Sequence, residues 1–200
     1  MEPIFAALLG YTLGSIPFGL LLTKAAGLGD VRAQGSGNIG ATNVLRTGNK
    51  GLAAATLLLD LAKGFVAVWL AWWLFGVVDP APVGPVSLAA LGAVLGHCFP
   101  VWLRFRGGKG VATNAGVCFG LAWQVGLAYA LVWLAVLALG RISSLAGMSA
   151  VVAAAIAAAV LGFGAFVPVL VIIAVLIIWL HRANVRRLLA GQEPKVGNKT

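Results

Sequence analysis

Apolar residues dominate the chain in long runs, and charged residues gather mostly between these runs. A helix needs about 20 apolar residues to cross a hydrocarbon core of about 30 Å, at about 1.5 Å per residue. Five runs meet or approach this length, namely 3–24, 51–78, 86–103, 143–161 and 165–181. We therefore expect an all-α membrane protein in which each of these runs forms one helix.

The stretch 111–140 is too long for one simple span and too short for two full ones. The loops after the first and third runs are basic, whereas the loop 79–85 has no Lys or Arg. If 111–140 crossed once, Arg141 and the basic tail would lie opposite the other basic loops, against the positive-inside rule. We expect a short helix to about Phe119 and a fuller one from about Trp123. A re-entrant segment, which enters and leaves the membrane on the same side, would also keep the basic loops on one side.

The resulting prediction is a single domain over 1–200, a polytopic membrane helix bundle of seven transmembrane helices, one or two of them short. The N-terminus lies outside and the C-terminus is cytoplasmic, so that every Lys and Arg except Lys63 lies on the cytoplasmic side. The N-terminal segment contains Glu2 and no Lys or Arg, so we interpret it as a first membrane helix and not as a signal peptide.

Composition supports a bilayer environment, because 61% of residues are hydrophobic, 10% are charged and the mean hydropathy is +1.01. The net charge of +9 indicates cytoplasmic loops, anionic lipid and an anionic substrate. No zinc-finger or RNA-binding pattern accompanies it, so we expect no nucleic acid. Cys98 and Cys118 form no CxxC pair and are expected to be small buried hydrophobes.

The first candidate site is the segment GSGNIGATNVLRTG at 35–48. Its glycines allow backbone N–H groups to converge on an anion, and its polar side chains add hydrogen-bonding groups. Arg46 adds a permanent charge that suits bidentate phosphate binding. A flexible loop with ordinary topology charges is the alternative. The residues proposed for binding here are Gly35, Ser36, Gly37, Asn38, Asn43 and Arg46.

The second candidate is RFRGGKGVAT at 104–113. Gly107, Gly108 and Gly110 offer backbone N–H groups at the start of a helix, and Lys109 adds a cation. The segment is not a Walker loop, because Lys109 is followed by glycine. We interpret Arg104 and Arg106 as topology determinants. His97, just upstream, is either a base or a structural histidine at a helix end.

The third candidate is HRANVRRLLAGQE at 181–193. His181 and Asn184 share a helix face, and Arg187 follows near it. The alternative is a basic amphipathic helix at the membrane surface. Farther upstream, Ser143 and Ser144 follow Arg141 at the start of a span, where a plain N-cap explains only one serine.

Two further features bear on the reaction class. Asp60 and Lys63 lie three residues apart within a predicted span, where we favour a structural ion pair. The chain has only five acidic residues and no cluster of them, so we expect no metal site, and metal-dependent phosphatidyltransferases are disfavoured. Common glycerolipid acyltransferases have an Asp five residues after a His. This pair is missing here, because those positions after His97 and His181 are occupied by Trp102 and Arg186.

Taken together, GSGNIGATN with Arg46, GHCFP followed by GGKG, and HRAN-x2-RL-x2-G-x-E resemble the three signatures of the bacterial acyl-phosphate-dependent glycerol-3-phosphate acyltransferases. The DLAKG run at 60–64 is also similar, and the resemblance covers essentially the whole chain. It favours Ser144 over Ser143 as the ligand-binding serine.

The resemblance implies transfer of a fatty acyl group from acyl phosphate to the 1-hydroxyl of glycerol-3-phosphate, giving lysophosphatidic acid and phosphate, without a cofactor. The site would face the cytoplasm from the bacterial inner membrane, and the soluble enzyme that makes acyl phosphate is a further candidate partner. We assign catalytic roles to Ser36, Lys109 and His181, with either His181 or substrate phosphate as base. A transporter of organic phosphates and a non-catalytic scaffold are the alternatives.

Overall fold

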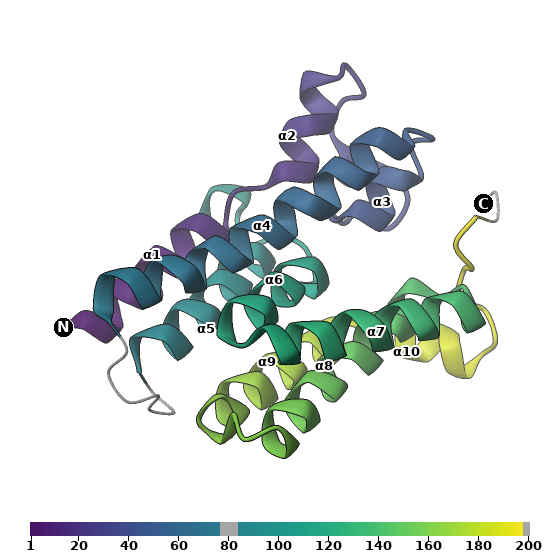
Figure 1. Cartoon of the computed structure of the whole chain (residues 1–200). Helices are drawn as coiled ribbons and strands as arrows, with labels where there is room; N and C mark the ends of the chain where they lie inside the picture. The colour runs from purple at the N-terminus through teal and green to yellow at the C-terminus, as the bar shows by residue number, and fades with distance from the viewer. Residues whose placement is uncertain (77–83, 198–200) are drawn as a thin grey trace.

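The computed structural model describes residues 1–76 and 84–197, and every regular element in these ranges is a helix (Figure 1). This confirms the expected all-α class for the part of the chain described. The α-helices are α1 (Glu2–Gly14), α2 (Phe18–Ala25), α3 (Ala41–Leu45), α4 (Lys50–Phe75), α5 (Pro85–Cys98), α6 (Val111–Leu121), α7 (Trp123–Gly140), α8 (Ser143–Val160), α9 (Val167–Leu180) and α10 (Arg182–Leu189). Three short 3-10 helices are η1 (Val31–Ala33), η2 (Val101–Leu103) and η3 (Gly164–Phe166).

The predicted turn within 111–140 is confirmed, because α6 ends at Leu121 and α7 begins at Trp123. Within the described ranges, 5 helical stretches have the length and composition to cross a membrane, and a sixth does so if α9 and α10, bent by 61°, count as one span. The 11-residue α6 is shorter than a full span. The count of seven crossings and the sides of the termini stay predictions, and positions 77–83 of the second run and following loop lie outside the described residues.

The first apolar run is not one continuous helix, which differs from the prediction for 3–24. It breaks between α1 and α2 at Pro17, whose ring removes a backbone N–H and clashes with the preceding turn. The Ser15 and Ile16 carbonyls at the break accept hydrogen bonds from side chains of other segments. Trp102 Nε1 bonds the Ser15 oxygen at 2.8 Å, and Lys63 Nζ bonds the Ile16 oxygen at 2.8 Å. Such partners are required where no water is available.

Small residues bring helix backbones into direct contact. Gly10 and Gly14 of α1 lie against backbone carbonyls of α5, and Gly92 and Gly96 of α5 lie against carbonyls of α1, with no room for a Cβ atom at any of them. In Figure 1, α1 and α5 lie side by side along the bundle with α4 beside them. Close approach through small residues is the usual basis of helix association in lipid, where burial of apolar surface gives little driving force.

The surface and interior agree with a protein embedded in lipid. Large apolar side chains such as Trp73, Leu139 and Val160 are mostly exposed. Cys98 and Cys118 are buried free thiols, as predicted. The helices α2, α3 and α10 lie at the end of the bundle away from the N-terminus, so the cations that they and their adjoining loops carry gather at this end (Figure 1).

Candidate active site

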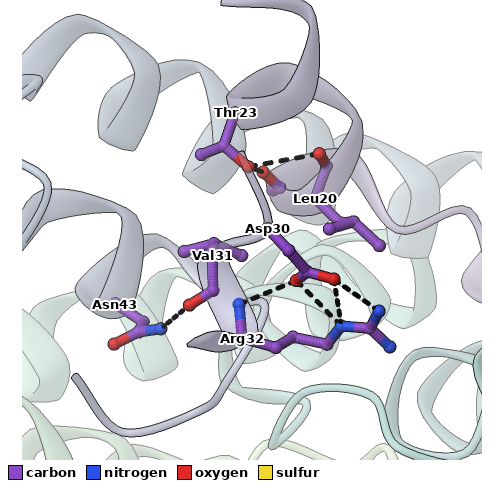
Figure 2. Close-up of polar contacts among 7 residues, drawn as sticks. Leu20, Thr23, Asp30, Val31, Arg32 and Asn43 are labelled. Carbon is purple, nitrogen blue, oxygen red and sulfur yellow. Dashed lines mark hydrogen bonds and ion pairs between the residues drawn. The ribbon is translucent and has the colours of Figure 1, made fainter. Parts of the chain in front are cut away.

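The first motif folds around the buried side chain of Asn43 in α3. Its Nδ2 atom donates to the carbonyls of Val31 at 2.8 Å, Gln34 at 3.1 Å and Asn38 at 2.8 Å. Its Oδ1 atom accepts from the backbone N–H of Ser36 at 2.9 Å. Figure 2 shows the bond to Val31. In this arrangement Asn43 shapes the loop from within, and its amide is fully engaged with the chain.

The entry to this loop is fixed by Asp30, which caps η1 (Figure 2). Its carboxylate accepts from the backbone N–H of Arg32 at 2.9 Å and from the Arg32 guanidinium at 2.6 Å. The side-chain hydrogen bond from Arg32 is the main cause that lowers the pKa of Asp30 to about 2. Arg32 is therefore paired with Asp30 at the loop entrance.

Gly35 and Arg46 meet across the same loop. Gly35 has a left-handed φ of 54°, and a Cβ atom there would lie 2.8 Å from Arg46 Cδ. A side chain at Gly35 would therefore displace Arg46, whose guanidinium is exposed. The expected concavity of free N–H groups is only partly realised, because Ser36 N–H bonds Asn43 and Gly37 N–H bonds the Gln34 carbonyl at 3.0 Å.

The second motif folds back onto the end of α5. The Gly108 N–H donates to the His97 carbonyl at 2.9 Å, and the Gly107 N–H donates to the Cys98 carbonyl at 3.1 Å. These two N–H groups were expected to face an anion, and here they instead anchor the loop. Gly110, with φ of 84°, is the N-cap of α6. The donors left for a ligand are those of the first turn of α6, which a helix cannot satisfy internally.

A hydrogen-bonded network joins the second and third motifs. Lys109 Nζ donates to Asn184 Oδ1, and Asn184 Nδ2 donates to Glu193 Oε1 at 2.5 Å. Ser144 Oγ donates to the same Glu193 oxygen at 2.6 Å, and Arg187 Nε donates to Glu193 Oε2 at 2.7 Å. We call these five residues the Glu193 network. It brings together three parts of the sequence, namely the second motif, the start of α8 and the third motif.

Glu193 is the residue that the sequence prediction missed. It stands at the end of the third motif, beyond Gly191, and the available signal was that it is the only acidic residue in that basic segment. Its side chain is 6% exposed. Burial would raise the pKa of Glu193, but the hydrogen bonds from Ser144, Asn184 and Arg187 outweigh it and hold the pKa below its ordinary value.

Positive charge dominates the surroundings of Lys109. Burial lowers the pKa of the Lys109 amine, and the charges of Arg187, Arg46 and Arg182 lower it further, while Glu193 acts in the opposite direction. Arg46 therefore shares the electrostatic environment of the Glu193 network, although it comes from the first motif. One carboxylate does not balance these cations, so the site has the electrostatics of an anion-binding site.

His181 lies at the junction of α9 and α10 and is buried. Its Nδ1 atom is 2.7 Å from the Ile177 carbonyl, which requires a proton on Nδ1 and leaves Nε2 as an acceptor. The Nε2 atom is therefore the ring nitrogen that can accept a proton.

The predicted site residues thus fall into three groups. Lys109, Ser144, Asn184 and Arg187 are joined through Glu193 and Asn184, Arg46 shares their electrostatic environment, and His181 caps α10 three residues before Asn184. The remaining predicted residues shape or border the loops that carry these groups, namely Gly35, Ser36, Gly37, Asn38, Asn43, Gly107, Gly108 and Gly110.

Fold and site together define an integral membrane helix bundle with a strongly cationic site where its loops meet. The sequence profile of the family described as glycerol-3-phosphate acyltransferase matches residues 4–191. A glycerol-3-phosphate acyltransferase from Erythrobacter litoralis is 71% identical over 199 residues, with 100% of this chain and 98% of that protein covered.

Two crystal structures of PlsY, an integral membrane glycerol 3-phosphate acyltransferase, have the same fold. The glycerol 3-phosphate form is 39% identical with a TM-score of 0.90, and the lysophosphatidic acid form is 38% identical with a TM-score of 0.88. Each comparison covers 98% of this chain and 96% of the other. The chain belongs to the family of integral membrane glycerol-3-phosphate acyltransferases. Since this is a family of enzymes, the transporter and scaffold alternatives are not retained.

Proposed function

We propose that the protein transfers a fatty acyl group from acyl phosphate to the 1-hydroxyl of glycerol-3-phosphate. The hydroxyl oxygen attacks the acyl carbonyl carbon, and the bond from that carbon to the phosphate oxygen breaks. The products are lysophosphatidic acid and inorganic phosphate, and the hydroxyl proton goes to a base. The observation that carries the proposal is the Glu193 network, which holds Lys109 and Arg187 among further cations.

Lys109 is our principal ligand for the phosphate of glycerol-3-phosphate. Its amine uses one N–H on Asn184 and has two more to offer. Arg187 uses only Nε on Glu193, which leaves its terminal nitrogens for a bidentate contact. A bound phosphate would supply the negative charge that this site lacks. Ser144 donates its proton to Glu193 in this arrangement, so it supports the carboxylate that orients Asn184 and Arg187.

The first motif is our candidate for the phosphate of the acyl donor. Ser36 is exposed on the loop organised by Asn43, and Arg46 lies across Gly35. Charge develops on the attacked carbonyl oxygen and on the leaving phosphate during the transfer. Arg46, Lys109 and the N-terminus of α6 are the groups positioned to stabilise that charge.

The acyl chain requires an apolar path that begins beside the site. A shallow groove of about 450 Å³ runs between α8 and α9, lined by Met148, Ser149, Val152, Ala153, Ile156 and Ile178. It begins one turn beyond Ser144, since Met148 follows Ser144 by four residues on α8. A chain lying here would enter from the surrounding lipid, which suits an amphipathic donor.

His181 is the best side-chain candidate for the base. Its Nε2 atom is available as an acceptor because Nδ1 faces the Ile177 carbonyl. An oxygen of the substrate phosphate is the other candidate. If His181 takes the proton, a His181→Ala protein at saturating substrates loses between about 10²- and 10⁴-fold in turnover. Near-normal turnover would assign the proton to the phosphate.

The proposed location is the bacterial inner membrane, with the site open to the cytoplasm. The one-sided distribution of cations supports this orientation. Glycerol-3-phosphate would arrive from the cytoplasm and the acyl chain of the donor from the inner leaflet, and the soluble enzyme that makes acyl phosphate is the candidate partner.

The proposal is tested with purified protein, acyl phosphate and labelled glycerol-3-phosphate, in the presence of EDTA and without nucleotide. We expect lysophosphatidic acid and an equal amount of phosphate. A Lys109→Ala protein serves as the control and should form at most a small fraction of the product. No product above this control would refute the proposal, and product only with an acyl thioester would assign a different donor.

A further inference from the structure

A second polar cluster lies deep in the bundle, apart from the Glu193 network. It consists of Asp60 and Lys63 of α4 and His97 of α5, whose side chains are 2%, 2% and 3% exposed. Lys63 Nζ is 2.7 Å from Asp60 Oδ1, which confirms the predicted ion pair. His97 Nδ1 is 3.6 Å from the same oxygen, an electrostatic contact beyond hydrogen-bond length.

One end of this cluster reaches the break in the first apolar run. Lys63 Nζ donates to the Ile16 carbonyl at 2.8 Å, and its charge lies 5.8 Å from the ring centre of Phe18. Charged groups inside a membrane are energetically costly and rare. An apolar pair of similar volume could fill the same space without that cost. The two charges therefore indicate a role other than packing.

The other end of the cluster reaches the loop that carries Lys109. A Cβ atom at Gly108 would overlap His97 Nε2, so the imidazole ring lies directly against the Gly108 backbone. The carbonyls of His97 and Cys98 hold the N–H groups of Gly108 and Gly107. The position of the ring therefore fixes the residue that precedes Lys109.

We propose that Asp60, Lys63 and His97 are positioning residues for the acyl transfer. The Asp60 carboxylate, held by Lys63, faces the Nδ1 side of the His97 ring, and the opposite edge of that ring supports Gly108. This support holds the Lys109 amine where it meets Asn184. The inference rests on the proposed function for the role of Lys109 in binding glycerol-3-phosphate. A merely structural ion pair would affect stability alone.

The test uses a double variant, Asp60→Asn with Lys63→Met, which removes both charges and leaves no buried charge unpaired. The Ile16 carbonyl keeps the Phe18 N–H as a donor at 3.1 Å. Calorimetry with glycerol-3-phosphate and no donor present measures Kd, and thermal unfolding in detergent measures Tm. We expect at least a tenfold rise in Kd with Tm within about 5 °C of the wild type, and an unchanged KM for the acyl donor.

A second variant, His97→Gln, keeps the proposal testable if the double variant does not fold. Its matched control is Ser87→Ala, which alters another buried polar side chain of α5, ten residues from His97. We expect His97→Gln to raise Kd at least tenfold and Ser87→Ala to leave it unchanged.

Three results would overturn the proposal. They are a Kd within threefold of wild type in a folded variant, an equal change in the Ser87→Ala control, and loss of fold in both test variants. Because calorimetry uses no donor, these results are independent of whether acyl phosphate is the donor, which the product assay on the wild-type protein decides.

Discussion

Replacing Glu193 by Gln tests whether this one carboxylate organises the site. The substitution keeps the size of the side chain but removes its charge and turns one oxygen into an NH₂ group. The remaining amide oxygen can still accept from Ser144 and Asn184. The NH₂ group then faces Arg187 Nε, which is also a donor, so the bond now at 2.7 Å is lost.

The magnitude follows from the bonds lost. A hydrogen bond to a charged group contributes about 1.5–3 kcal/mol. Arg187 is 41% exposed, so water recovers part of the loss on its side. The remainder is roughly 1.5–2 kcal/mol, and at about 1.4 kcal/mol per factor of ten it predicts a 10- to 30-fold fall in kcat/KM.

The assay is the initial rate of lysophosphatidic acid formation at varied glycerol-3-phosphate and saturating donor, together with Tm in detergent. The effect should fall mainly on the KM for glycerol-3-phosphate, because Lys109 reaches the network through Asn184. Glu2→Gln, at the exposed start of α1, is the control. A kcat/KM within threefold of wild type, or a change confined to the KM for the donor, would show that Glu193 does not organise the site.

Two further predictions concern packing. Gly108→Ala would press a methyl group into His97 and should lower acyltransferase activity at least tenfold. Gly140→Ala, whose Cβ position has open space around it, should leave the activity unchanged, and equal activities of the two variants would disprove the close approach of Gly108 to His97. Gly14→Ala would push α1 away from a backbone carbonyl of α5 and should lower Tm by several degrees relative to Gly140→Ala, and an unchanged Tm would argue against this helix contact.

The sequence predicted the helices correctly where the apolar runs and the distribution of positive charges both limit the possible topologies. The positive-inside rule predicted the turn before Trp123, although no break in apolarity marks it. The break at Pro17 was missed because proline sits in an otherwise apolar run, and proline is tolerated in membrane helices when other groups satisfy the freed carbonyls. Those groups, Trp102 and Lys63, are far away in the sequence.

The site shows a similar limit. The residue types in the three motifs indicate which cations and amides gather, because cationic side chains set among glycines and amides are typical of phosphate binding. Spacing does not reveal how each N–H group is used, and those of Gly107 and Gly108 proved to anchor the loop. Glu193 was missed because a carboxylate in a phosphate site is unexpected until its three donors are seen together.

The short helix α6 ties the site to the membrane around it. With 11 residues it covers about 17 Å, and the Gly120 carbonyl near its end bonds Trp72 Nε1 at 3.1 Å. The 26-residue α4 can tilt when the bilayer becomes thinner or thicker, but α6 has no excess length with which to compensate. We therefore expect the position of Lys109 relative to the lipid headgroups to change with bilayer thickness. Since lipid chain length sets that thickness, a phospholipid-synthesis enzyme of this fold works in an environment that its own pathway determines.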